Sequence, residues 1–278
     1  MAVSDCSLRS SAQPPSSLLR ARTALVTPDG ARSIAAAHAP LVAVAHGSRD
    51  PRSAASIAAL LDVLRAAEPG LDVRAAFLDL SAPRLPDVLS GIAAQGHREA
   101  VVVPLLLGSA FHARVDLPTL VGQAHARFPR LSVSVSDVLG PDERLAEVAL
   151  RRVVAAGARL DDPSLGIVLA GAGSSHAPAN DAVAAVAASW ARRFPVAGVR
   201  AAFASTADPD VPAAVAALRA SGARRIAVAS WFLAPGRLPD RVAALAGDAA
   251  VAEPLGDAPE LASLIVDRYF DVAAVTAA

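Results

Sequence analysis

Two histidines and one aspartate each follow a stretch of sequence that has the composition of a buried β-strand. His46 comes directly after the first such stretch, Asp79 after the second, and His112 lies in the loop after the third. Two neutral imidazoles and a carboxylate suit a divalent first-row metal ion such as Fe²⁺, Co²⁺, Ni²⁺ or Zn²⁺. Imidazole also takes up and releases protons near neutral pH. The three residues therefore predict one place that handles a metal ion and accepts protons.

Each of the three also has an ordinary structural explanation. A histidine after a strand is often a hydrogen-bonded loop residue, and His112 would then be a surface side chain. Asp79 could cap the segment before Pro83, because aspartate is common in turns. The occurrence of all three at the ends of predicted strands favours the functional interpretation.

Five neighbouring residues are candidates for holding a substrate. Backbone N–H groups of Gly47 and Ser48, at a strand-to-helix turn, could bind an anion, although such a turn is ordinary in α/β folds. Arg49, Arg52 and Arg114 lie in or beside the same loops and could pair with carboxylates.

The elements that must position these residues alternate between short β-rich runs and helix-length stretches rich in Ala and Leu. This alternation is typical of parallel strands joined by crossover helices. In a sheet of order 2-1-3-4 the three side chains would reach one pocket at the carboxyl edge. The expected strands are 41–45, 73–78, 100–107 and 131–138, and the expected helices are 52–67, 85–95, 117–128 and 142–156.

The second half of the chain repeats this plan at a fixed displacement of 126 residues. Arg74-Ala75-Ala76-Phe77 recurs as Arg200-Ala201-Ala202-Phe203, and Gly47-Ser48 recurs as Gly173-Ser174. The displacement falls to 116 at Leu139-Gly140, which predicts a loss of about ten residues after the third strand of the second copy. We therefore expect an α/β fold of two similar lobes, each a four-stranded parallel sheet flanked by helices. Residues 1–39 would form a flexible tail, 40–157 the catalytic lobe and 158–278 the diverged duplicate.

The second copy lacks the chemical groups of the first. Ala172 stands where His46 would be, Ser205 stands where Asp79 would be, and the shortened loop has no histidine in place of His112. One working site and one retained scaffold are the simplest interpretation.

Composition excludes several classes of function. The 26 basic residues, all arginine, balance 26 acidic ones, which argues against nucleic-acid binding and excludes lysine chemistry. A single cysteine, Cys6, excludes an internal disulfide and a Cys-ligated cluster. We expect no membrane span, no secretion signal and no organic cofactor, and we expect a cytoplasmic protein.

The motifs AHGSRDP, FLDL with Pro83, and VVVPLLLGSAFHARVDLP together resemble the CbiX/SirB-type class II chelatases, in their long two-lobed form. The resemblance is clearest over residues 42–154. It implies that a tetrapyrrole, sirohydrochlorin, lies in a cleft between two lobes, with His46 and His112 as metal ligands and proton acceptors. The family's acidic residue after the second strand is usually Glu, and here it is Asp79. The shorter side chain of Asp79 favours proton relay over metal ligation.

The implied reaction inserts a divalent metal, which is a substrate, and releases two protons. Fe²⁺ insertion for sirohaem is the first expectation, and Co²⁺ insertion for cobalamin is the alternative, because both ions accept these ligands. A non-catalytic tetrapyrrole or metal carrier is an alternative of another class. Phosphate transfer through His46 is disfavoured, since Ala45 stands where a phosphohistidine enzyme would have Arg. Because the duplication supplies both lobes, we expect a monomer.

Overall fold

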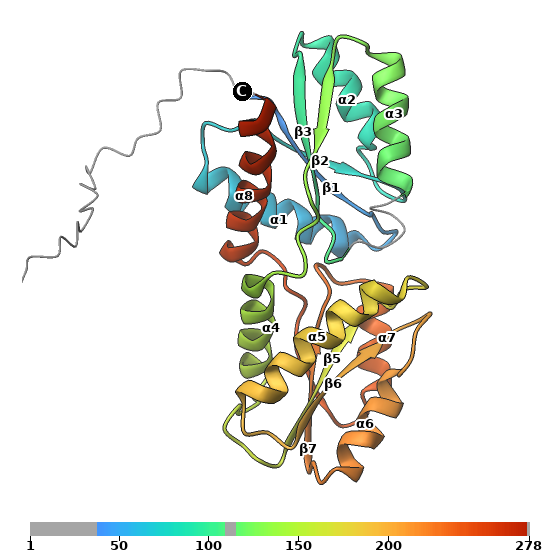
Figure 1. Cartoon of the computed structure of the whole chain (residues 1–278), viewed down its shortest axis with the longest axis vertical. Helices are drawn as coiled ribbons and strands as arrows, with labels where there is room; N and C mark the ends of the chain where they lie inside the picture. The colour runs from blue at the N-terminus through green and yellow to red at the C-terminus, as the bar shows by residue number, and fades with distance from the viewer. Residues whose placement is uncertain (1–37, 109–114, 277–278) are drawn as a thin grey trace, which may run out of the picture. The chain divides into compact units, whose positions relative to one another are not determined.

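Two four-stranded parallel sheets, each covered by helices on both faces, form the part of the chain that the structure describes. The computed structural model describes residues 38–108 and 115–276 (Figure 1). The first sheet has the order β2-β1-β3-β4 and the second has the order β6-β5-β7-β8. Both orders agree with the expected 2-1-3-4 arrangement. The strands are β1 (Leu41–Ala45), β2 (Val73–Phe77), β3 (Glu99–Pro104), β4 (Ser132–Val135), β5 (Leu165–Gly171), β6 (Gly198–Phe203), β7 (Arg225–Ser230) and β8 (Ala250–Val251).

The helices follow the strands in strict alternation, as the sequence pattern predicts. Several begin with a proline in the first turn, where the missing N–H costs nothing. No helix in the described part of the chain is long and apolar enough to cross a membrane. The helices are α1 (Pro51–Ala67), α2 (Leu85–Ala94), α3 (Leu117–Arg127), α4 (Glu143–Ala155), α5 (Ala177–Arg193), α6 (Val211–Ala220), α7 (Arg237–Leu245) and α8 (Pro259–Thr276).

The register of the strands confirms the duplication. Ala45 pairs with Phe77 in the first sheet, and Gly171 pairs with Phe203 in the second, so each pair is displaced by 126 residues. Later in the copies, the N–H of Leu139 donates to the carbonyl of Leu106, and that of Leu255 donates to that of Phe232. Leu106 and Phe232 differ by 126 residues whereas Leu139 and Leu255 differ by 116, as the predicted deletion requires.

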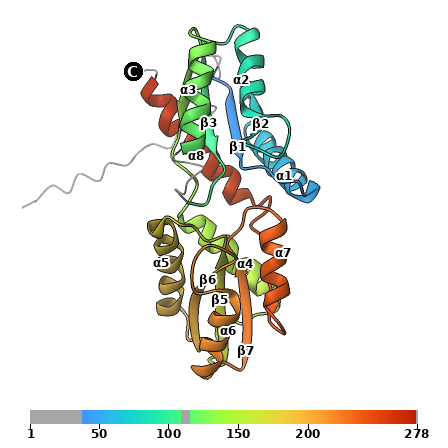
Figure 2. The ribbon, with the colours of Figure 1, turned by 90° about the vertical axis from the view of Figure 1, so that its right-hand side faces the viewer.

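Alternating side chains of each strand enter two separate cores. In the first sheet, Val42 and Val102 pack beneath α2 and α3, whereas Val101 and Val103 face α1 and α8. In the second sheet, one face packs on α6 and α7 and the other on α4 and α5. Figure 2 shows α2 and α3 together over the first sheet.

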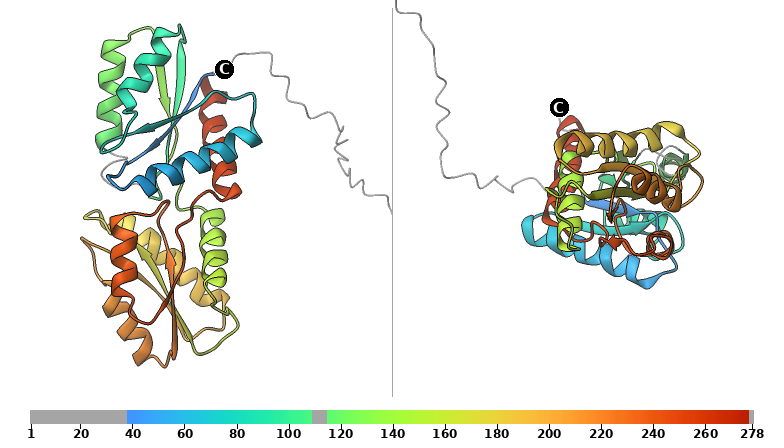
Figure 3. Two further views of the ribbon diagram at one scale, coloured as in Figure 1. Left: turned by 180° about the vertical axis from the view of Figure 1, so that it is seen from behind. Right: turned by 90° about the horizontal axis from the view of Figure 1, so that it is seen from below.

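The last helix of each copy covers the sheet of the other copy. Helix α8 contacts β3 and α1, and α4 contacts β7; both neighbourhoods are visible from the front in Figure 1 and from behind in Figure 3. The Arg151 guanidinium joins α4 to α8 through both carboxylate oxygens of Glu260, at 2.7 and 2.9 Å. The boundary between the two lobes at residue 157 stays a prediction. It divides the sequence repeat, whereas α4 and α8 each pack against the sheet of the other copy.

Candidate functional site

His46 and Asp79, two of the predicted site residues, lie at the carboxyl edge of the first sheet. Because β2 and β3 flank β1, the segments that follow these three strands are neighbours. The N–H of Asp79 donates to the carbonyl of His46 over 2.9 Å, so the two residues are adjacent across the ends of β1 and β2. Both are exposed. His112 and Arg114 lie outside the described residues, and their roles stay predictions.

Gly47 lets the two loops of the site approach each other closely. Its φ is +93°, and a Cβ placed there would lie 1.7 Å from the carbonyl oxygen of Asp79. Glycine has no Cβ to collide with this oxygen, and it adopts a positive φ without the energetic cost that other residues have. The sequence motif therefore contains Gly47 for a structural reason, and substrate binding by its N–H stays a prediction.

Ser48 is tied to the loop that follows β2. Its N–H donates to Oγ of Ser81 at 3.0 Å, and the Ser81 hydroxyl donates back to the carbonyl of Ser48 at 2.8 Å. The Oγ of Ser48 accepts the N–H of Asp50 at 3.0 Å. These bonds fix the turn between β1 and α1, which carries His46 at its start. Sequence reasoning missed Ser81, because no spacing rule links a serine to a loop 33 residues earlier.

The carboxylate of Asp79 forms an ion pair with Arg84, with 3.1 Å between Oδ1 and Nη1. Both side chains are about half exposed, so water competes for the pair and it is weak. A metal ion or an imidazolium would therefore compete with Arg84 for this carboxylate. The N-terminus of α2, which lies after Pro83, has no side-chain cap hydrogen bond.

The two described arginines of the site differ in their partners. Arg52 contacts Asp50 and also Asp240 of α7, each at 2.5 Å, and thereby links the first copy to the second. Hydrogen bonds from Arg52 lower the pKa of the Asp50 carboxyl. Arg49 is exposed and has no ion pair within the described ranges. Arg49 is thus available to a ligand, whereas Arg52 would have to exchange partners.

The second copy keeps the backbone of this site without its chemical groups. The N–H of Ser205 donates to the carbonyl of Ala172 at 3.0 Å, and Gly173 has a φ of +83° with its Cβ position 1.8 Å from the Ser205 carbonyl oxygen. Leu80 and Thr206, which differ by 126 residues, both have a positive φ near 60°. The same strained conformation thus occurs in a copy that has Ala172 and Ser205 in place of His46 and Asp79. The fold therefore determines this loop conformation, whether or not the chemical groups are present.

A cavity of about 190 Å³ lies where the second copy's edge meets the first copy. Leu106, Leu107 and Gly108, which follow β3, line it together with Gly173 and Trp231. Most of this surface is apolar. A flat, largely apolar ligand that lies over the edge of the first sheet would find a complementary wall here.

Within residues 38–108 and 115–276, no three His, Cys, Asp or Glu side chains are grouped so that they could hold a metal ion. His46 and Asp79 supply two of the predicted groups, and the third falls in the segment 109–114. The described site is thus a pair of groups beside the strand that leads into His112.

The profile of the CbiX family matches residues 40–156 and again residues 166–272. The chain belongs to the CbiX family. Sirohydrochlorin ferrochelatase of Priestia megaterium is 30% identical over 135 residues, which cover 48% of this chain and 49% of that protein. Sirohydrochlorin cobaltochelatase of Saccharolobus solfataricus is 36% identical over 83 residues, or 28% of this chain and 65% of that protein. This chain therefore spans about half of the length of the Priestia protein.

The fold of this CbiX-family chain is also that of a solved chelatase structure. SirB from Bacillus subtilis with Fe³⁺ superposes with a TM-score of 0.74 at 23% identity, covering 86% of this chain and 97% of that chain. The predicted two-lobed class II chelatase fold is confirmed.

Proposed function

We propose that this protein inserts a divalent metal ion into sirohydrochlorin with release of two protons. The adjacency of His46 and Asp79 at the carboxyl edge of the first sheet, beside the strand that leads into His112, carries the proposal. Relatives in the family with this activity support it. Fe²⁺ is the metal that we propose first and Co²⁺ is the alternative, since ferrochelatases and cobaltochelatases match parts of the chain of similar length, 135 and 140 residues.

The chemistry of insertion sets what the residues must do. Two pyrrole N–H protons leave as the metal enters, so bases are needed beside a loosely held ion. We assign His46 and His112 as ligands and proton acceptors, because imidazole has an ordinary pKa of about 6.5 and exchanges protons near neutral pH. Asp79 would hold an imidazolium or relay its proton, in exchange for its pair with Arg84.

The substrate's carboxylates need cationic partners, although the protein as a whole is neutral. Arg49 and Arg114 are our first candidates, followed by Arg52 after release from Asp240. Gly47 and Ser48 would contribute by fixing the loop. We infer a cytoplasmic monomer without an organic cofactor, in which both lobes come from one chain.

An insertion assay tests the function and the metal together. Sirohydrochlorin absorbance is followed in single turnover with Fe²⁺, Co²⁺ or Ni²⁺, with and without the protein. We expect acceleration over the buffer rate, greatest with Fe²⁺. Greatest acceleration with Co²⁺ would assign the cobaltochelatase alternative. A bound complex without acceleration would establish the carrier alternative and refute catalysis.

Variants then test the assigned residues. We expect His46→Ala and His112→Ala each to remove most of the activity while the fold survives, and Asp79→Ala to be milder. Ser205→Ala is the matched control for Asp79→Ala, because Ser205 occupies the same backbone position in the second copy. A near wild-type rate for either histidine variant at saturating metal would exclude its role.

A further inference from the structure

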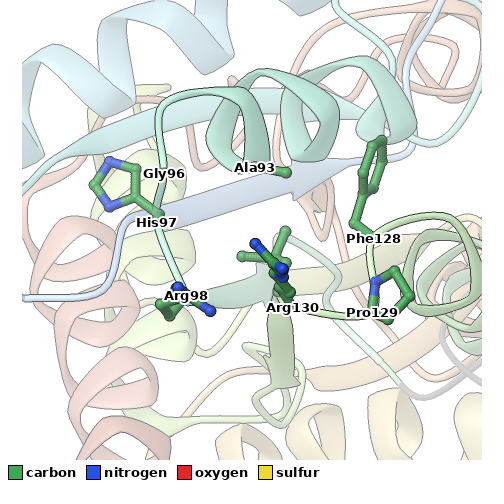
Figure 4. Close-up of a pocket in the computed structure, with 8 residues that line it drawn as sticks. Ala93, Gly96, His97, Arg98, Phe128, Pro129 and Arg130 are labelled. Carbon is green, nitrogen blue, oxygen red and sulfur yellow. The ribbon is translucent and has the colours of Figure 1, made fainter.

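A groove with a different character lies at the amino edge of the first sheet, where β3 and β4 begin. It has a volume of about 430 Å³ and is formed where α2 and α3 end and the chain turns into the next strand. Figure 4 shows Gly96 and His97 on one side, Phe128 and Pro129 on the other, and Arg98 and Arg130 between them. His46 and Asp79 lie at the opposite edge of the same sheet.

The polar side chains of this groove are all basic. Arg98, Arg130 and His97 line it and no acidic residue does. In the described part of the chain, neither Arg98 nor Arg130 has an ion pair or a side-chain hydrogen bond to a carbonyl. The nearest acid in sequence, Glu99, shares the face of β3 with Val101 and Val103, which pack toward α1 and α8, and so lies on the other face of the sheet from α2 and α3.

The helix ends offset only part of this positive charge. The C-termini of α2 and α3 each present a partial negative charge of about half a unit to the groove. Arg98 and Arg130 supply two full positive charges, and Arg127 adds a third beside the ring of Phe128, 5.3 Å from its centroid. The field in the groove is therefore positive.

The second copy has an arginine with a carboxylate partner at the same place. Arg219 stands 126 residues after Ala93, and its guanidinium binds both carboxylate oxygens of Asp248, at 2.8 and 2.9 Å. The same guanidinium donates to the carbonyl of Arg224, which is the counterpart of Arg98. In the first copy the small Ala93 leaves this space open. At this position one copy therefore has an arginine paired with a carboxylate of the same chain, whereas the other copy is open and cationic.

We propose that the groove binds a small organic anion that carries a phosphate or carboxylate on a flat apolar body. The guanidinium groups of Arg98 and Arg130 match the oxygen geometry of such an anion and bind it in place of the missing acidic partner. Phe128, Pro129 and Leu131 provide the apolar surface for its body. The volume suits a small molecule and not a macromolecular segment.

Calorimetric titration of the full chain with phenyl phosphate, benzoate and benzyl alcohol tests this proposal. We expect saturable binding of phenyl phosphate or benzoate and at least tenfold weaker binding of the neutral alcohol. Phenyl phosphate alone would identify a phosphate ligand, and benzoate alone a carboxylate ligand. Arg98→Ala with Arg130→Ala should weaken binding at least tenfold, without a change in chelatase rate. Equal binding of the neutral alcohol, or no saturable binding of either anion, would refute the proposal.

Two further variants separate shape from charge. Ala93→Arg adds a positive charge but places the counterpart of Arg219 in the groove, so we expect it to abolish binding. Arg224→Ala removes the matching charge of the second copy and should leave binding unchanged. Tighter binding to Ala93→Arg, or a tenfold loss with Arg224→Ala, would show that the anion binds by net charge alone and would overturn the site.

Discussion

Gly47→Ala tests the claim that close contact between two loops builds the site. The backbone at Gly47 has a φ of +93°, and the added Cβ would lie 1.7 Å from the carbonyl oxygen of Asp79. The loops must therefore separate by well over 1 Å, which opens the hydrogen bond between Asp79 and His46. The second copy offers a matched control in Gly173, where the φ is +83° and the corresponding distance is 1.8 Å.

The magnitude follows from two costs. The left-handed conformation costs a non-glycine residue about 1–2 kcal/mol, and overpacking adds about 1–3 kcal/mol. We expect Gly47→Ala and Gly173→Ala each to lower the free energy of unfolding by about 2–5 kcal/mol. Gly157 has a φ of +95° with nothing within 4 Å of its Cβ position, so Gly157→Ala should show only the conformational cost.

Urea unfolding followed by circular dichroism measures these three free energies. The insertion rate per folded molecule then separates structure from function: Gly47→Ala should lose most activity, whereas Gly173→Ala should keep it. If Gly47→Ala costs no more stability than Gly157→Ala, the loops do not touch as described. If Gly47→Ala and Gly173→Ala lose activity equally, the second copy contributes to the chemistry.

Three other perturbations probe the ion pairs and the buried tyrosine. Asp240→Asn removes the ion pair with Arg52. Because both side chains are 54% exposed, the free energy of unfolding measured in urea should change by less than about 1 kcal/mol. A larger change would mean that this pair holds the two copies together. Hydrogen bonds from Arg144 lower the pKa of the Asp142 carboxyl, so this group stabilises the fold above about pH 4 and loses that contribution as pH falls further. Asp142→Asn should therefore reduce the difference in the free energy of unfolding between pH 7 and pH 3. An unchanged difference would show that the Asp142 carboxyl does not contribute to acid destabilisation. Burial raises the pKa of Tyr269 to about 12. The protonated tyrosine therefore contributes its full stability below pH 10, and the free energy of unfolding falls as pH rises from 10 to 12. An ultraviolet titration of this tyrosine with a midpoint near pH 10 would contradict its burial.

The sequence alone predicted the strands and helices of the first copy closely and their repetition in the second, because alternation and apolar periodicity are local. The expected strand 41–45 is β1 without change, and the expected helix 52–67 differs from α1 by one residue. The strand order also followed, since the crossover plan leaves few alternatives. Expected strands ran too long where apolar residues continue into the loops: 100–107 is Glu99–Pro104 in the structure.

Side-chain partners at the site could not be predicted in the same way. The pair of Asp79 with Arg84 depends on the turn between β2 and α2, and that of Arg52 with Asp240 joins residues 188 apart. Neither has a spacing signature, because the fold and not the local sequence brings the charges together. The positive φ of Leu80 was equally hidden, since leucine gives no sign of a left-handed turn.

The exchange of α4 and α8 shows a further limit that comes from the duplication itself. Periodicity defines an apolar face on each helix, but the two sheets are copies and offer similar surfaces to it. Which sheet a helix covers is decided by the connections, such as the turn at Gly140, whose Cβ position lies 2.6 Å from the carbonyl oxygen of Leu107. As a result, the strand leading to His112 is covered by the last helix of the chain. The second copy therefore remains necessary to the first even though it has lost the chemical groups, because its final helix completes the core beneath the site.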